Sequence, residues 1–185
     1  MSPSSSGDAP NTDIAQRIFA EQVRELHNQR LTTIPSSLVT ALAIAVIVNQ
    51  HVSTPAIVQW LGVLLTAQLL TAISVFAYRR AAPPQNQARR WAHVQGVNTA
   101  LTGTAWGSLV LLIWPQDELY RLLLLLLLAG ISAVAAVGAA SLKRAALGIL
   151  VPIWSLALLR LSRESAPFYQ ALSWLVLLFL FVMTA

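Results

Sequence analysis

The chain has 185 residues, of which 56% are hydrophobic and only 10% are charged, whereas about 25% of the residues of an ordinary soluble domain are charged. This composition excludes a water-soluble fold of this size and predicts an all-α, polytopic membrane protein. Cysteine is absent, which excludes disulfides, thiolate metal sites and thiol nucleophiles. The formal net charge of +5 does not predict nucleic-acid binding, because the basic residues form short clusters between apolar runs rather than one patch.

The N-terminal part precedes the apolar segments and has two sections. Residues 1–11 are small, polar and proline-containing, which predicts a disordered tail and not a signal peptide. Residues 12–33 carry apolar side chains mostly at spacings of three to five, with charged side chains largely between them. This pattern predicts an amphipathic helix, too charged to cross a bilayer, that lies on the cytoplasmic membrane surface or packs against the bundle.

Residues 34–185 are predicted to form a bundle of six transmembrane helices, since a crossing needs about 20 mostly apolar residues. The predicted spans are 34–49, 56–78, 92–114, 119–142, 145–161 and 167–185. The connections between them are short, so neighbouring spans are expected to run mostly antiparallel.

The distribution of basic residues predicts the orientation of this bundle. Nine of the 12 lysines and arginines fall on the side of the N-terminus, and only Arg121, Arg160 and Arg163 fall on the other side. Both termini are therefore expected in the cytoplasm of a bacterium, with the bundle in its inner membrane. The apolar run continues to Ala185 without a basic cluster behind it, so we expect a fragment that is cut where a cytoplasmic continuation begins.

Polar and aromatic residues within the predicted spans are the candidates for ligand binding. Asn98 and Thr102 either hydrogen-bond between helices, for about 1 kcal/mol each, or line a pocket. Trp106, Trp154 and Trp174 lie deeper than an interfacial aromatic belt. They either pack between helices or line an outward-facing pocket for a lipid-like or aromatic small molecule.

Small residues and one proline indicate how the helices pack. Two stripes of small residues predict close helix contacts, within one chain or between two copies: Gly103 with Gly107, and Ser132 with Ala136 and Ala140. Pro152, in the middle of the fifth span, removes a backbone hydrogen bond and predicts a kink, which is either a static bend or a hinge.

No catalytic constellation is present in the sequence. It has no Walker loop, GxSxG, HExxH, paired carboxylates or kinase signature, so we expect no catalytic residue and no cofactor. His51 and His93 fall on opposite faces of the predicted bundle, which argues against a shared haem or metal site.

Several short stretches together resemble a family of membrane domains. They are FAEQVRELHNQ at 19–29 with Pro35 behind it, ARRW at 88–91 leading to GTAWG at 103–107, a WPxxE loop at 114–118, AGISA at 129–133 and VP at 151–152. Over residues 16–185 the chain resembles the N-terminal multi-helix membrane domain of bacterial sensor histidine kinases and of diguanylate cyclase or phosphodiesterase proteins. Many members read RLLYRQ where this chain has RELHNQ at 24–29.

The resemblance implies that the last helix continues into a cytoplasmic coiled coil and an output domain, and that the protein is a homodimer. It transfers no ligand-binding residue to this chain. The function expected from the sequence is a membrane-embedded input module of a bacterial signalling protein. The alternatives are a small transporter or channel, which the lack of a buried charge disfavours, and a scaffold subunit that docks through residues 12–30.

Overall fold

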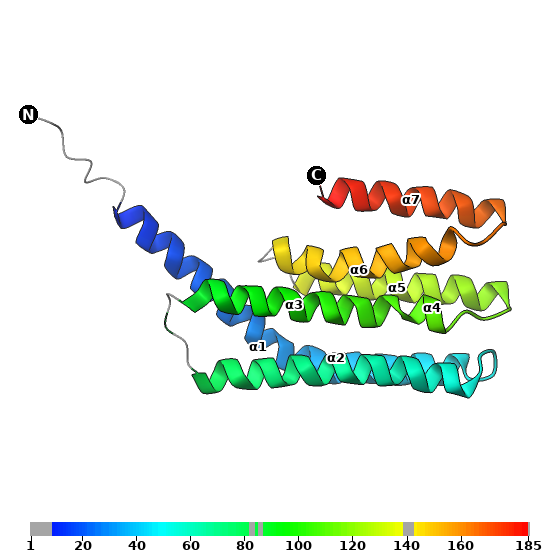
Figure 1. The fold of residues 1–185 in the computed structure, drawn as a ribbon, viewed down its shortest axis with the longest axis horizontal. Coiled ribbons are helices and arrows are strands. Elements are labelled where there is room, and N and C mark those ends of the chain that lie inside the picture. The colour runs from blue at the N-terminus through cyan, green and yellow to red at the C-terminus, as the bar shows by residue number, and fades with distance from the viewer. Residues whose placement is uncertain (1–8, 82–83, 85–86, 139–142, 185) are drawn as a thin grey trace, which may run out of the picture.

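The computed structural model of the chain describes residues 9–81, 84, 87–138 and 143–184. Within these residues all regular secondary structure is helical, and successive long helices run up and down in an elongated bundle (Figure 1). The helices are α1 (Ala9–Val48), α2 (Thr54–Ala81), α3 (Ala88–Gly107), α4 (Leu109–Leu112), α5 (Glu118–Gly138), α6 (Lys143–Leu161) and α7 (Pro167–Thr184). The predicted all-α class is therefore confirmed.

Helix α1 differs from its prediction, because it joins two predicted elements into one helix of 40 residues. No break separates residues 12–33 from the first apolar segment, and Pro35 lies inside the helix without ending it. One face of the segment after Pro35 is buried in the core, where α1 packs on α2, and this packing favours continuation over the lost backbone hydrogen bond. The buried residues of this face are Ala41, Ile44, Ala45 and Val48. The helix also begins at Ala9, within the predicted tail, whose residues 1–8 lie outside the described part of the chain.

The third predicted span, 92–114, is assigned as two helices in the structure. Helix α3 ends at Gly107 and the short α4 follows after Ser108, whose backbone keeps right-handed helical dihedrals and donates a 2.8 Å hydrogen bond to the Thr104 carbonyl, so the interruption is slight. Glycine and serine are both weak helix formers, and the Ser108 hydroxyl donates a 2.8 Å hydrogen bond to the carbonyl of Ala105. The bounds of α5, α6 and α7 agree with the predicted spans to within a few residues, apart from residues 139–142 and 185, which are not described.

Helices α3 and α6 form the centre of the bundle. They run in the same direction and share the most extensive helix–helix contact. Helices α1 and α2 pack on α3, whereas α5 and α7 pack on α6. The core between them is apolar and includes fully buried large side chains from five helices: Trp60, Leu64, Leu109, Leu124, Leu128, Ile153, Leu161 and Tyr169.

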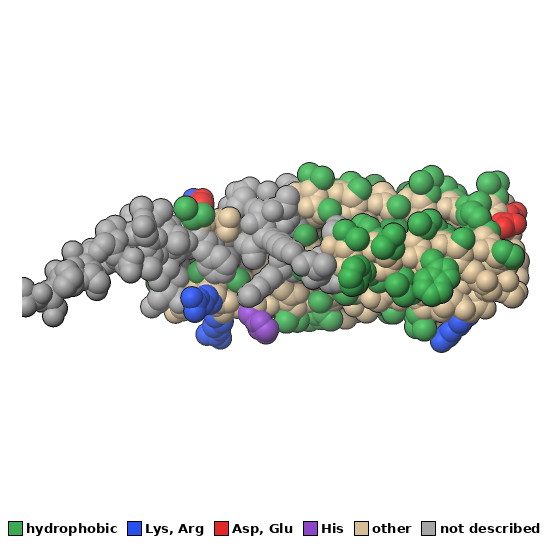
Figure 2. Space-filling view, turned by 90° about the horizontal axis from the view of Figure 1, so that it is seen from above, with side chains coloured by type: hydrophobic (Ala, Val, Ile, Leu, Met, Phe, Trp, Pro, Cys, Tyr) green, Lys and Arg blue, Asp and Glu red, His purple; other side chains and the backbone are tan. Residues whose placement is uncertain are grey.

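The two ends of the bundle differ in which chain segments they contain. One end, the terminal end, holds the start of α1 and the end of α7, together with the ends of α2 and α5 and the starts of α3 and α6 (Figure 1). The other, the loop end, holds the α1–α2, α4–α5 and α6–α7 loops. Charged side chains lie near the two ends, and hydrophobic side chains cover much of the surface between them (Figure 2). The structure thus separates charge and apolar surface along the long axis.

Two helices of the described chain are long and apolar enough to cross a membrane, namely α2 and residues Glu118–Val137 of α5. Shorter apolar helical segments are Thr33–Val48, Ala145–Leu161 and Pro167–Val182. Helix α3 is less apolar than these segments, since it carries two arginines in its first turn and a row of amide and hydroxyl side chains further along. These side chains are the basis of the candidate site.

Candidate functional site

Two aromatic contacts fix the axial register of α2 against α3. At one level the rings of Trp60 and Trp106 lie 5.8 Å apart, and the Trp60 indole donates a 3.3 Å hydrogen bond to the Ala105 carbonyl. Nearer the terminal end, the rings of Tyr78 and Trp91 lie 5.1 Å apart. Because antiparallel helices advance equally by about 1.5 Å per residue, the stretches between these contacts face one another.

Both facing stretches carry buried polar side chains. On α3, Gln95, Asn98, Thr99 and Thr102 follow the i, i+3, i+4, i+7 spacing of one helix face, and all four are buried. On α2, at the same height, Gln68 and Thr71 are buried and Ser74 is half-buried. These seven residues, with Ser37 of α1, are called the polar layer below.

Some members of the polar layer have hydrogen-bond partners. The Gln68 amide donates to the hydroxyl of Ser37 over 2.7 Å, which links α2 to α1. The hydroxyls of Thr71, Thr99 and Thr102 donate to backbone carbonyls one turn earlier in their own helices. Threonine can therefore be buried in a helix bundle at little cost.

Other members have no partner. Both the oxygen and the nitrogen of the Gln95 amide are buried without a hydrogen bond, although Gln95 is only 2% exposed. The same holds for the Asn98 nitrogen and the Ser74 hydroxyl. An unpaired buried amide costs roughly 1–3 kcal/mol in proteins. The polar layer therefore offers unused donors and acceptors, which a water or a small polar molecule can satisfy.

The polar layer is neutral. All buried polar side chains of the described residues are amides or hydroxyls. Such groups can orient a neutral ligand by hydrogen bonds, but they supply neither a general base nor a strong metal ligand.

The polar layer touches α6 through Thr99. A Cβ added to Gly148 would lie 2.6 Å from the Thr99 hydroxyl oxygen, so only glycine permits this approach. Pro152, one turn later in α6, has no N–H to donate to the carbonyl of Gly148. The helix continues through Pro152, and its role as a hinge remains a prediction.

The two predicted stripes of small residues have different surroundings. Gly103 and Gly107 lie against the backbone of Ile149 and Ile153, so this GxxxG pair packs α3 on α6 within one chain. Ser132 is buried and its hydroxyl donates to the carbonyl of Leu128 in its own helix. Ala136 packs against the core, and Ala140 lies outside the described residues.

The three tryptophans predicted to line one pocket lie in different places. Trp106 is 3% exposed and packs on Trp60. Trp154 is half-buried, and its ring lies 5.8 Å from that of Phe179 in α7. Trp174 is 71% exposed on α7. The three tryptophans therefore do not come together in this chain, and a role of Trp174 in an outward-facing pocket stays a prediction. Asn98 and Thr102 do belong to the polar layer.

The sequence reasoning missed Gln95, Thr71 and Ser74. Gln95 could have been found, because it stands one helical turn before Asn98 and Thr99 on the same face. Thr71 and Ser74 gave no comparable signal, since isolated hydroxyl residues are common in membrane helices.

Comparison with known proteins adds no assignment to these observations. No protein-family model, curated protein or solved structure matches the chain. The chemistry of the polar layer and the arrangement of the helices are thus the basis for a functional proposal.

Proposed function

We propose that this chain is the membrane-embedded sensory module of a bacterial signal-transduction protein. In this proposal all six long helices cross the inner membrane, and both termini are cytoplasmic. A small molecule binds in the polar layer, and α7 passes the signal to a histidine kinase or cyclic-di-GMP output domain. This chain itself carries no catalysis.

The apolar sides of the bundle support the membrane location. Large hydrophobic side chains are exposed along α1, α2, α5 and α7. A soluble monomer rarely exposes such extended apolar surface, whereas lipid tails cover it without cost. The arginine pairs Arg79–Arg80 and Arg89–Arg90 flank the α2–α3 connection at the terminal end, which favours this end as the cytoplasmic one.

The single observation that carries the proposal is the unpaired amide of Gln95 in the polar layer. Unsatisfied polar groups are costly inside a bundle that lipid surrounds, because no bulk water is available to replace the missing partner. A bound water or ligand that supplies the missing partner offsets this cost. A ligand that both donates and accepts hydrogen bonds, on a lipid-like or aromatic body, fits the amides of Gln95 and Asn98 and the apolar residues around them.

A contiguous set of contacts leads from the polar layer to α7. Thr99 lies against Gly148 in α6, and further along α6 Trp154 packs edge to face on Phe179 of α7. Helix α7 packs principally on α6. A shift of α6 on α3 therefore moves α7, and a ligand that favours one packing changes the population of the two arrangements. We further propose that α7 acts within a homodimer, as the resemblance implies.

Three measurements test the proposal. The reading frame downstream of codon 185 should continue into a coiled coil and one of the two output domains, and a stop codon there would contradict the input-module function. In reconstituted protein, hydrophobic extracts of the host should raise the unfolding temperature of the native chain but not of Gln95→Leu. Substrate flux or ion current in proteoliposomes would instead favour the transporter alternative.

A further inference from the structure

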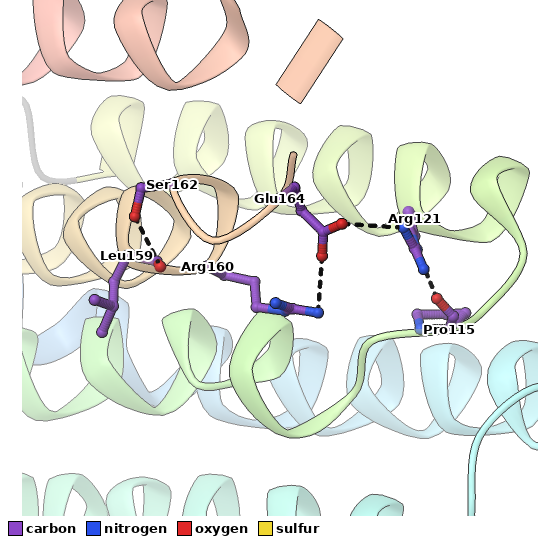
Figure 3. Close-up of polar contacts among 6 residues, drawn as sticks. All are labelled: Pro115, Arg121, Leu159, Arg160, Ser162 and Glu164. Carbon is purple, nitrogen blue, oxygen red and sulfur yellow. Dashed lines mark hydrogen bonds and ion pairs between the residues drawn. The ribbon is translucent and has the colours of Figure 1, made fainter. Parts of the chain in front are cut away.

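Three charged side chains meet at the loop end, far from the polar layer. Arg160 at the end of α6 and Arg121 in the first turn of α5 both contact the carboxylate of Glu164 in the α6–α7 loop, at 2.9 Å and 3.4 Å (Figure 3). The Arg121 Nε also donates a 2.7 Å hydrogen bond to the Pro115 carbonyl. The side chains of Arg121 and Glu164 are 18% exposed and that of Arg160 is 23% exposed. The three groups are partly withdrawn from water, but each remains accessible.

Two aromatic residues complete this cluster. The guanidinium carbons of Arg160 and Arg121 lie 4.7 Å and 5.5 Å from the ring centroid of Trp114. The ring of Tyr169 lies 6.2 Å from that of Trp114. The Trp114 indole nitrogen and the Tyr169 hydroxyl are buried without a hydrogen-bond partner, and Tyr169 is only 2% exposed. Arg121, Arg160, Glu164, Trp114 and Tyr169 are called the loop-end cluster.

The side chains of the loop-end cluster are rich in donors and poor in acceptors. Two guanidinium groups contact a single carboxylate, and the neighbouring aromatic residues add one indole N–H and one phenol hydroxyl. The cluster carries one excess positive charge, and its longer Arg121–Glu164 contact is near the upper limit of a hydrogen bond. The excess positive charge favours an anionic ligand with acceptor atoms over a neutral or cationic one.

We propose that the loop-end cluster is a binding site for an oxyanion with several acceptor oxygens, of the phosphate class. The two guanidinium groups hold the anion, which competes with Glu164 for their N–H donors. The Tyr169 hydroxyl supplies a further donor. In a membrane this end lies at the height of the lipid headgroups, so the phosphate comes from a lipid headgroup or from solution.

The remaining charges of the loop end do not neutralise the site. Asp117 and Glu118 are exposed, and the Asp117 carboxylate accepts a hydrogen bond from the backbone N–H of Leu119. Arg163 is also exposed. Exposed charges act in water, where salt screens them over about 8–10 Å. Arg163→Gln therefore provides a matched control, because it removes the same charge from the same segment while the backbone N–H of residue 163 still donates to the Arg160 carbonyl.

The test uses the full chain in nanodiscs of phosphatidylcholine, titrated with inorganic phosphate and, separately, with chloride at equal ionic strength. Phosphate binding is followed by calorimetry and by the unfolding temperature. We expect phosphate, and not chloride, to bind the native chain. Arg160→Gln should weaken binding about tenfold, as expected for the loss of a charge-assisted donor, whereas Arg163→Gln should leave it unchanged.

Two further variants keep the test decisive if Arg160→Gln does not fold. Glu164→Gln removes the competing carboxylate and should strengthen phosphate binding, which a purely structural ion pair would not do. Tyr169→Phe keeps the ring and removes the hydroxyl, and it should weaken binding.

A second arm distinguishes the sources of the phosphate. Nanodiscs that contain phosphatidylglycerol should raise the unfolding temperature of the native chain more than that of Arg160→Gln if the headgroup is the ligand. Binding of free phosphate in phosphatidylcholine discs indicates a soluble ligand. The proposal is overturned if neither probe acts, or if Arg163→Gln weakens binding as much as Arg160→Gln.

Discussion

Gly103 of α3 lies against the backbone of Ile149 in α6, so closely that a Cβ added to the glycine would meet the Ile149 carbonyl oxygen and lie 2.9 Å from its Cα. The two central helices therefore touch through their backbones at this point. Because backbone atoms cannot rotate aside as a side chain can, this contact fixes the distance between the two helix axes at Gly103.

Gly103→Ala should destabilise the bundle by about 1–3 kcal/mol, since the added methyl group forces α3 and α6 apart. The control is Gly130→Ala on α5, where no neighbouring atom lies within 4 Å of the added Cβ. That variant should be unchanged or more stable by up to about 1 kcal/mol, the usual helix preference of alanine over glycine. Unfolding by denaturing detergent, followed by circular dichroism, measures both. Equal effects of the two variants would contradict the close contact.

Gln95→Leu and Gln68→Leu should differ in stability although both remove a buried amide. Gln68→Leu breaks the hydrogen bond to Ser37 and should cost about 1 kcal/mol. Gln95→Leu removes an amide without a partner and should be neutral or stabilising. The same unfolding measurement compares them. A larger loss for Gln95→Leu would show that its amide has a partner in the membrane and would contradict its role as an open binding group.

Trp106→Ala should lower the stability of the chain much more than Trp174→Ala, because one tryptophan lies in the core and the other on the surface. Trp106 is buried against Trp60, and its truncation should cost about 3–5 kcal/mol through the cavity it leaves. Trp174 is largely exposed, and its truncation should change stability by less than about 0.5 kcal/mol. Thermal unfolding in one detergent measures both. A large loss at Trp174 would mean that another chain covers this face of α7.

The orientation of the bundle can be measured with single cysteines, because the native chain has none. Ser53→Cys and Ser162→Cys lie exposed in two loops of the loop end, and Gln87→Cys lies exposed beside the α2–α3 connection. A membrane-impermeant maleimide added to intact cells should label the first two positions. It should label Gln87→Cys only after the inner membrane is permeabilised. The opposite pattern would place the arginine-rich end outside and reverse the proposed orientation.

Much of the fold could be predicted from the sequence, because apolar runs of sufficient length and the residues between them delimit helices. The predicted bounds of α5, α6 and α7 agree with the structure on this basis. The predicted division between residues 12–33 and 34–49 is absent, because α1 continues through Pro35 to residues that pack on α2. The slight interruption at Ser108 was not predicted, since glycine and serine are weak helix formers that many helices tolerate.

The candidate site could be predicted only in part. The helical spacing of Asn98, Thr99 and Thr102 places them on one face, but the spacing does not reveal which helix that face meets or whether the amides find partners. The loop-end cluster gave no sequence signal, since Arg121, Arg160 and Glu164 come from segments that meet only in the folded chain.

The sequence by itself determined the helical class, the apolar sides and the placement of charge at the ends, because these depend on local composition and on the period of one helix. Only the tertiary structure decided that Gly103 packs against α6 of the same chain, that Trp174 faces outward and that Gln95 lacks a partner. Those properties depend on how each helix is rotated against its neighbours, and rotation is set by the packing of all the helices together.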